Sequence, residues 1–394
     1  MKKIGIFLAT IISLGAISWW MIGADWRRLL SDPPSGSDVL FWSQGQRDAG
    51  FRMLDRVPFI SEKRTIKAGQ IARDFEVGKP INFSFDINTY FEHQRHSSLI
   101  IVHNGKIRYE QYGLDFQESG RWASFSVAKS ITSTLVGAAI RDGYINSLDD
   151  SIADYITELK GSVYDKVSIE HLLTMQSGVG WNEDYDDRES DVSLFTQHIS
   201  DDERSNLVSY MSSLQRVHQP GAVWNYSTGE TNLIGILVSE ATGKPLAEYL
   251  SEKIWRPYGM QQDANWLLNK DGIEISGCCI QAATRDYARY GQFILDGALI
   301  DDTQILPEGW IEAATSSQIG HPLFNGKGGY GYQWWTYSDG TYQAVGIFGQ
   351  IIHIDPSRQL IIAANSSWTS ALGDKEFKAR RQFIEDVAAA IDRE

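Results

Sequence analysis

The feature that most constrains the fold of this chain is a small, mostly apolar run that follows a serine and a lysine. Ser126 and Lys129 are three residues apart, so on a helix they share one face, about one turn from each other. Residues 131–140, Ile-Thr-Ser-Thr-Leu-Val-Gly-Ala-Ala-Ile, predict a helix that is buried all round. A chain of 394 residues is long enough to bury the large core that such a helix needs.

The same pattern predicts an activated serine. A lysine at the start of a buried helix loses hydration, which lowers its pKa and makes a neutral amine available as a base. Ser126 beside Lys129 can then lose its proton as it attacks a carbonyl, and its own amide can stabilise the oxyanion. A solvated lysine on a surface helix is the alternative, but a solvated helix would not continue into so apolar a run.

Composition narrows the classes of partner. The chain is 42% hydrophobic and 22% charged, as expected of a globular protein. Its formal net charge of -14 argues against a nucleic-acid partner, because phosphate binding requires a basic surface. No metal or cofactor is expected, and the oligomeric state is not predicted.

The N-terminus has the pattern of an export signal. Residues 4–24 are uncharged, follow Met-Lys-Lys, and are long enough to span a membrane. A clean small-x-small cleavage site is missing near the end of the run, where Trp19 and Trp20 suit a membrane interface. We therefore predict a membrane anchor with the remaining chain outside the cytoplasm, for example in the periplasm. A cleaved signal is the alternative.

Hydrophobic patterning divides the remaining chain. Residues 1–30 form the signal or anchor, residues 31–79 a linker and N-terminal extension, and residues 80–394 the main domain. An early hairpin, central helices, late strands and a last helix predict an α/β fold of the α+β type, with a mostly antiparallel sheet flanked by helices and a helical insertion. The expected strands are 98–103, 106–110, 331–336, 342–346, 351–355 and 360–364, and the expected helices include 171–175, 231–242, 284–295 and 376–391.

A serine–lysine site needs a second proton-transfer group and a second oxyanion donor. Tyr226 lies in a turn-rich segment just before a helix, from which a phenol can project into a cleft. A nearby lysine cation would lower its pKa and let it move a proton. Glycines at a strand edge in Gly346-Ile347-Phe348-Gly349-Gln350 allow close approach of a substrate, so we predict that the Gln350 amide completes the oxyanion hole. A plain bulge in a core strand is the alternative.

These residues belong to a wider set of ordered motifs. The chain resembles the serine β-lactamase and penicillin-binding-protein superfamily, in the class C-like branch that includes esterases and 6-aminohexanoate-dimer hydrolases. The resemblance covers roughly residues 80–390 and rests on Ser126-Val127-Ala128-Lys129, His171-Leu172-Leu173-Thr174-Met175-Gln176-Ser177-Gly178, Tyr226-Ser227-Thr228, Pro257-Tyr258-Gly259-Met260, residues 283–291 and the region from Trp334 to Gln350.

The resemblance implies a serine hydrolase that forms an acyl-enzyme on Ser126, with Lys129 and Tyr226 as general bases and acids. The Ser126 and Gln350 amides would hold the oxyanion. A small-molecule ester or amide is the expected substrate. Tyr185 lies in a loop similar to one that supplies a substrate-binding tyrosine, although a solvated acidic turn is an alternative. Further substrate-binding candidates are Trp335, Phe348 and Gly349.

Two departures from the family pattern bear on the substrate. The late strand reads Ile-Phe-Gly over residues 347–349, where β-lactamases and carboxypeptidases carry a cationic motif that binds the substrate carboxylate. Thr228 stands where class C enzymes have asparagine. A D-alanyl-D-alanine carboxypeptidase or class C-like β-lactamase remains an alternative, as does an anchored penicillin-recognising binding module without turnover.

Two pairs of residues carry weaker signals. Cys278 and Cys279 are adjacent, and adjacent cysteines rarely meet disulfide geometry, so we predict two small buried residues without a disulfide. His93 and His96 have a spacing that could ligate a metal, but no third ligand is evident, so we predict a solvated pair.

Overall fold

The computed structural model describes residues 17–34, 39–57, 62–319, 323 and 326–394. Its centre is an eight-stranded sheet in which every neighbouring pair is antiparallel except the last. In spatial order the strands are β10 (Gly328–Tyr330), β11 (Trp335–Tyr337), β12 (Tyr342–Gly346), β13 (Gln350–Asp355), β14 (Leu360–Ser366), β3 (His96–His103), β4 (Lys106–Tyr112) and β2 (Glu76–Val77).

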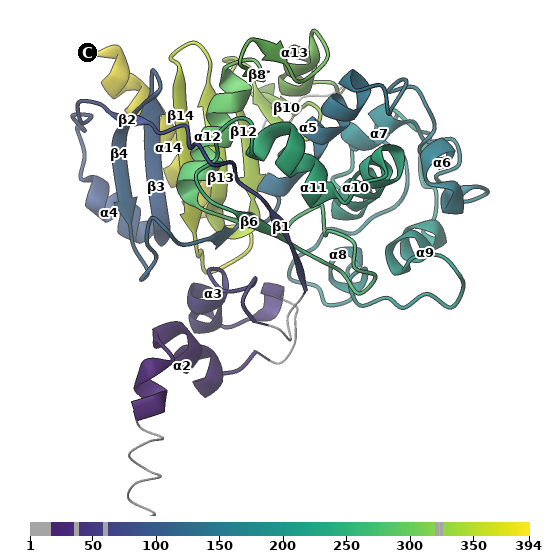
Figure 1. The fold of residues 1–394 in the computed structure, drawn as a ribbon, viewed down its shortest axis with the longest axis horizontal. Coiled ribbons are helices and arrows are strands. Elements are labelled where there is room, and N and C mark those ends of the chain that lie inside the picture. Colours follow the sequence, from purple (N-terminus) through teal and green to yellow (C-terminus); the bar gives the residue numbers. More distant parts are fainter. Residues whose placement is uncertain (1–16, 35–38, 58–61, 320–322, 324–325) are drawn as a thin grey trace, which may run out of the picture.

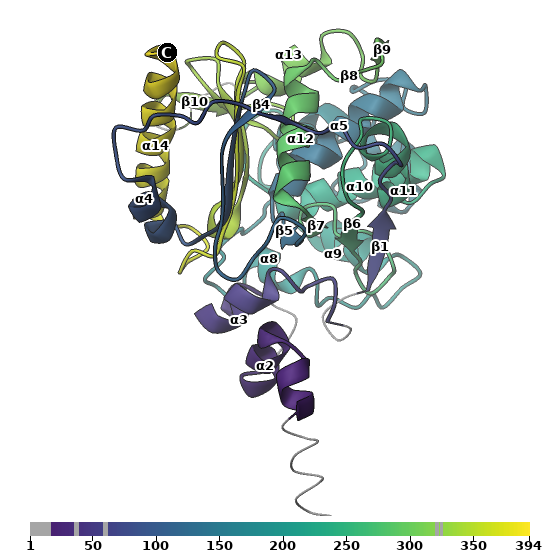
Figure 2. The ribbon, with the colours of Figure 1, turned by 60° about the vertical axis from the view of Figure 1, so that its left-hand side comes forward.

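Helices cover both faces of this sheet (Figures 1 and 2). α14 (Asp374–Asp392) packs on one face together with α4 (Ile87–His93), and α12 (Thr284–Leu295) packs on the other. Successive side chains of a strand point to opposite faces, so Leu99 and Ile101 join the α14 core while Ile100 and Val102 join the α12 core. Burial on both faces explains why the sequence of β3 is apolar without alternation.

The helix that follows Ser126 lies at the centre of the larger core. α5 (Val127–Arg141) buries thirteen of its fifteen residues, as the apolar run predicted. Trp310 packs so closely against it that a Cβ at Gly137 would lie 2.6 Å from the indole. On its other side lie helices of the insertion, seen at the right of Figure 1. They are α6 (Ile152–Tyr155), α7 (Ile169–Leu173), α8 (Asp191–Leu194), α9 (Asn206–Ser213), α10 (Thr228–Thr242) and α11 (Leu246–Leu250).

A second, four-stranded sheet leads the chain into the site. Its order is β1 (Lys63–Ile66), β6 (Ala264–Leu267), β7 (Ile280–Ala282) and β5 (Trp122–Ala123), and β5 ends three residues before Ser126. β1 and β2 come from residues expected to form a linker and extension, yet both pair with strands of the main fold. The remaining elements are α2 (Ala24–Ser31), α3 (Gln44–Gly50), β8 (Leu299–Ile300), β9 (Thr303–Gln304) and α13 (Trp310–Thr315).

The structure corrects two local predictions. The strand expected at 331–336 forms only at its end, where Trp335 and Thr336 belong to β11. Residues 331–334 are instead a turn between β10 and β11, because Gln333 has a left-handed φ of 61° and Gly331 lies against the Ala314 carbonyl. His93 and His96 do not form a solvated pair. His96 is buried beside the rings of Tyr90 and Phe91, and burial lowers its pKa to about 3.

Part of the predicted N-terminal anchor can be compared with the structure. Residues 4–16 of this segment lie outside the described residues. In the described ranges, no helix is both long and apolar enough to cross a membrane. At the start of those ranges Trp20 and Met21 are 75% and 80% exposed.

Candidate active site

Ser126 is presented by a strained turn at the start of α5. The preceding residue, Phe125, has a left-handed φ of 43°, a conformation that a bulky residue adopts only where packing imposes it. Its ring packs against Phe51 and Phe348 at centroid distances of 4.8 and 5.4 Å, which holds the turn in place. Ser126 itself lines a cavity and forms the N-cap of the helix.

Three hydrogen bonds hold the Lys129 amine. Its Nζ atom lies 2.8 Å from Ser126 Oγ, 2.8 Å from Thr228 Oγ1 and 2.8 Å from the carbonyl oxygen of Gly277. The residue is 1% exposed, so these partners replace its hydration almost completely.

These partners orient the Lys129 nitrogen towards Ser126. A carbonyl such as that of Gly277 can only accept, and the Thr228 hydroxyl donates its own proton to Glu183, so it too accepts from Lys129. Two N–H bonds are thereby fixed, and the remaining position of the nitrogen faces Ser126. In the neutral amine that position is the lone pair, which can accept the Ser126 proton.

The protonation of Lys129 suits this role. Burial lowers its pKa to about 8, against the opposing effect of the Glu183 carboxylate. A substantial fraction of the amine is therefore neutral in mildly alkaline solution, as the sequence predicted from desolvation.

Tyr226 approaches Ser126 from the loop before α10. Its side chain interacts with that of Ser126, and Lys129 Nζ lies 5.0 Å from its ring centroid. The ring stacks on Trp335 with centroids 5.6 Å apart. The predicted lowering of its pKa is wrong, because burial, together with the Glu183 charge, raises the pKa of Tyr226 above its usual value. Tyr226 is therefore a neutral phenol that can donate a proton.

Glu183 was not predicted from the sequence. Its carboxylate accepts hydrogen bonds from the Trp181 indole, the Tyr185 hydroxyl at 2.8 Å, and both the amide (2.9 Å) and the hydroxyl of Thr228. Glu183 thus fixes Thr228, which in turn orients Lys129. Trp181, Glu183 and Tyr185 are two residues apart, and this alternation in an extended segment was the signal that could have identified them as one inward-facing set.

The predicted His171–Gly178 motif positions the tyrosine loop. The Met175 carbonyl accepts the amide of Asn225 at 2.9 Å, and the Gln176 carbonyl accepts the amide of Gly221 at 2.7 Å. Gly178 has a φ of +76°, and a Cβ there would lie 2.2 Å from the His218 carbonyl oxygen. Only glycine fits this crossing of two backbones.

The end of β12 forms the wall opposite α5. A Cβ at Gly346 would lie 2.6 Å from the Ser124 carbonyl oxygen, so the backbone at this position passes directly beside the nucleophile turn. Gly346 and Ile347 both line the cavity with Ser126. The Ile347 amide is therefore the candidate for the second oxyanion donor, beside the amide of Ser126.

The structure corrects the prediction for Gln350, Phe348 and Gly349. Gln350 pairs with Gly346 in the sheet, is fully buried, and uses its side-chain amide to bind the carbonyls of Ile347 and Ser366 at 3.0 Å each. Phe348 is fully buried behind the wall, and Gly349 lies against Trp368. The chain turns at residues 347–349, which directs these three residues away from the cavity.

The cysteines were also predicted incorrectly. Cys278 and Cys279 form a disulfide in the loop that follows Gly277, the residue whose carbonyl binds Lys129. Cys279 has a left-handed φ of 77°, which brings the two neighbouring side chains together.

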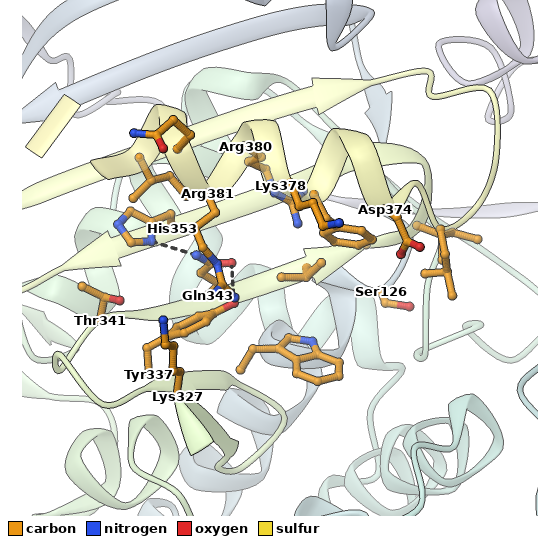
Figure 3. Close-up of a pocket in the computed structure, with 18 of the residues that line it drawn as sticks. Ser126, Lys327, Tyr337, Thr341, Gln343, His353, Asp374, Lys378, Arg380 and Arg381 are labelled. Atoms are coloured by element: carbon orange, nitrogen blue, oxygen red, sulfur yellow. Dashed lines mark hydrogen bonds between the residues drawn. The ribbon is translucent and has the colours of Figure 1, made fainter. Parts of the chain in front are cut away.

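The cavity in front of Ser126 has a volume of about 1070 Å³ (Figure 3). Tyr185, Tyr226 and Trp335 line it near Ser126, whereas Gln343 and His353 line it farther along the sheet. The structure thus places the predicted substrate-binding candidates Tyr185 and Trp335 on the cavity. Among the described residues, no group of three or more His, Cys, Asp or Glu side chains could hold a metal ion.

Comparison with known proteins places this site in a family. Residues 88–387 match the family described as Beta-lactamase. The chain belongs to this family. The predicted superfamily and fold class are confirmed. As a member of this family, the protein is a serine hydrolase.

Individual relatives agree with this assignment. The 6-aminohexanoate-dimer hydrolase of Paenarthrobacter ureafaciens is 26% identical over 321 residues, which cover 78% of this chain and 81% of that protein. Esterase EstB of Burkholderia gladioli is 27% identical over 180 residues, 41% of this chain and 45% of EstB. A solved structure from Bacillus anthracis, assigned as a 6-aminohexanoate-dimer hydrolase, has a TM-score of 0.77 at 22% identity and covers 88% of this chain and 94% of its own.

Proposed function

We propose that this β-lactamase family member hydrolyses an ester or amide bond through an acyl-enzyme on Ser126. The observation that carries the proposal is the orientation of Lys129, whose two N–H bonds are held by Gly277 and Thr228 while its third position faces Ser126. A lysine held in this way accepts the serine proton without having to reorient.

In the acylation step, Ser126 Oγ bonds to the carbonyl carbon and its proton passes to Lys129 Nζ. The carbonyl oxygen becomes an oxyanion that accepts from the backbone amides of Ser126 and Ile347. The bond to the leaving group then breaks, and Tyr226 donates its hydroxyl proton to that group while the Lys129 proton replaces it. This restores the neutral amine and leaves an acyl ester on Ser126.

Deacylation reverses the proton path. Water attacks the acyl carbon and transfers a proton to Tyr226, whose own proton moves to Lys129. The acid is released as Ser126 Oγ recovers the proton. Because the pKa of Tyr226 is raised, the phenol only relays protons and Lys129 is the base.

An ester or amide is favoured over a β-lactam as substrate. The segment that ends β12 carries no cation at residues 347–349, and such a site should bind a carboxylate next to the scissile bond poorly. The relatives named esterase and 6-aminohexanoate-dimer hydrolase support the same substrate class. A β-lactamase or D-alanyl-D-alanine carboxypeptidase is the second candidate, and the family match favours it.

Hydrolysis of short-chain 4-nitrophenyl esters tests the proposal. Ser126→Ala should abolish turnover while leaving the fold intact, and Lys129→Met should lower activity nearly as much because the two residues act as a unit. Ser338→Ala removes a hydroxyl from the same cavity and should leave the rate within about twofold of wild type. Retained activity in Ser126→Ala would rule out this nucleophile.

Nitrocefin and a fluorescent penicillin separate the candidates. Faster turnover of nitrocefin than of the esters would favour β-lactamase activity. Stoichiometric labelling by penicillin without product release would instead favour the binding module.

We also propose that the catalytic domain lies outside the cytoplasm and is anchored by residues 4–24. The uncharged run after Met-Lys-Lys supports this, as do Trp20 and Met21, which are largely exposed near the end of the run. Fractionation of cells should recover the full chain with membranes, and protease added outside the inner membrane should digest it. Recovery in the cytosolic fraction would contradict the anchor.

A further inference from the structure

The cavity that contains Ser126 has a cationic wall supplied by the C-terminal helix. Asp374, Phe377, Lys378, Arg381 and Glu385 follow a spacing of three and four along α14, so they share the face that lines the cavity. Arg380 lines the same cavity from the border between this face and the sheet. Figure 3 shows Asp374, Lys378, Arg380 and Arg381 on the helix beside the strands that carry Gln343 and His353.

Arg380 is a buried cation without an anionic partner. It is 5% exposed, and its Nη1 atom is buried without a hydrogen-bond partner. In the described ranges, no carboxylate forms an ion pair with it, and its guanidinium lies only over the rings of Trp368 (5.1 Å) and Phe377 (4.7 Å). Burial lowers its pKa to about 10, against opposing effects from Tyr337 and Tyr90.

An unpaired buried charge is costly, so native proteins almost always give such a group a counter-ion. The acidic residues that line the cavity are Glu183, Asp339, Asp374 and Glu385. Glu183 is engaged at Thr228, and Asp339 accepts both the amide and the hydroxyl of Thr341. Neither they nor Asp374 and Glu385 form an ion pair with Arg380 in the described ranges. The unpaired guanidinium of Arg380 therefore points to an anion that enters the cavity from outside.

We propose that Arg380 binds a carboxylate of the substrate, remote from the bond that Ser126 cleaves. This inference rests on the proposed function, because Arg380 lines the same cavity as Ser126. It specifies the substrate class as esters or amides that carry a terminal carboxylate on an extended chain. The guanidinium suits this role because its planar N–H groups match the two oxygens of a carboxylate.

The surroundings of Arg380 fit a carboxylate. Tyr337, Gln343 and His353 form a neutral polar chain beside it, in which the Tyr337 hydroxyl donates to Gln343 at 3.3 Å and Gln343 Nε2 lies 3.1 Å from His353 Nδ1. Burial lowers the pKa of His353 to about 4, so the imidazole is neutral at physiological pH. Lys378 and Arg381 are exposed at the rim, where they add positive potential without an ion pair to any described residue.

The strand register sets the length of the substrate. Gly346 lies beside the nucleophile turn, and Gln343, paired with His353 near Arg380, lies three residues farther along β12. Three residues of a strand span roughly 10 Å. A carboxylate bound at Arg380 therefore needs several methylene groups between it and the scissile carbonyl.

Binding to an acylation-deficient protein tests the site without requiring turnover. Full-length Ser126→Ala is titrated calorimetrically with the mono-4-nitroanilides of succinic, glutaric, adipic, pimelic and suberic acids, and with the neutral 4-nitroanilide of pentanoic acid. The anionic anilides should bind more tightly than the neutral one, increasingly so for the longer chains. Adding Arg380→Met should raise their dissociation constant about tenfold or more and leave that of the neutral anilide unchanged.

The matched control is Lys375→Met, which removes a cation from an exposed position of α14 outside the cavity and should change neither affinity. Equal binding of anionic and neutral anilides by Ser126→Ala overturns the proposal, whether or not Arg380→Met folds. An equal loss for both ligands in a folded Arg380→Met variant also overturns it.

The kinetic counterpart separates this inference from the proposed function. Wild-type protein should hydrolyse the mono-4-nitrophenyl esters of the same acids with a kcat/KM that falls as salt is added, unlike that of 4-nitrophenyl pentanoate. Anion-selective binding without any hydrolysis would retain the Arg380 site and refute the hydrolase mechanism. Hydrolysis of both the anionic and the neutral esters without anion selectivity would retain the hydrolase mechanism and refute the Arg380 site.

Discussion

Replacing Glu183 by glutamine tests the electrostatic coupling between the Glu183 carboxylate, which the sequence analysis did not identify, and the Lys129 amine. Glu183 and Lys129 contact the same Thr228 hydroxyl, so the two charged atoms that contact it are at most roughly 5 Å apart, the sum of two hydrogen-bond lengths. The carboxylate stabilises the ammonium form and so raises the pKa of Lys129. Glu183→Gln removes the charge, and the neutral amine should then persist to lower pH.

The size of the effect follows from this separation. Two unit charges 5 Å apart interact by about 3 kcal/mol at an effective dielectric constant of 20. Glu183 is only half-buried, so solvent screening reduces that figure to about 1 to 2 kcal/mol, equivalent to about one pH unit. The acidic limb of the rate profile, expected near pH 8 in the wild type, should therefore move down by about one unit.

The assay is the pH dependence of kcat/KM for a neutral 4-nitrophenyl ester. Glutamine offers one acceptor oxygen where the carboxylate offered two, so the maximum kcat/KM should also fall. The midpoint of the acidic limb does not depend on this maximum. Asp186→Asn is the matched control, because it removes a carboxylate from an exposed position of the same loop. A midpoint that stays in place or moves upward in Glu183→Gln would refute the coupling.

Two further variants test the walls of the cavity. In Gly346→Ala the new methyl meets the Ser124 carbonyl oxygen, which cannot move aside, so kcat should fall about tenfold or more. In Gly180→Ala the nearest neighbour of the new methyl is the Val217 side chain at 3.2 Å, so this variant should have little effect. Equal kinetics of the two variants would contradict the assigned contact. Phe348→Leu should lower the free energy of unfolding by about 1 to 2 kcal/mol in thermal denaturation and leave the KM of a neutral ester unchanged. A raised KM would indicate that Phe348 contacts the substrate.

The strands and helices were predictable where local patterning and burial agree. The run after Ser126 predicted α5, and Gly243, with its left-handed φ of 67°, ends α10 where a helix stop was expected. The strand prediction was wrong at residues 331–334, because their aromatic residues have the composition of a strand while contacts with Ala314 impose a turn.

The chemistry of the site was predictable only in part. Ser126 and Lys129 share one helix, so their spacing alone brings them together. Thr228 and Gly277 reach Lys129 from segments about 100 and 150 residues away, as only the tertiary fold can arrange.

The errors in the late hairpin have a similar cause. The glycines at 346 and 349 indicated a close backbone approach, but only the strand register shows which amide faces the nucleophile. Gly346 pairs with Gln350, so the cavity is lined by Ile347 at the turn and not by Gln350.

The most direct measurement is the mass of the intact protein during turnover of a 4-nitrophenyl ester, followed by peptide mapping. The wild type should gain the mass of the acyl group on the peptide that contains Ser126, and Ser126→Ala should gain none. Hydrolysis with the acyl group on another residue, or without any covalent adduct under rapid quenching, would contradict the mechanism.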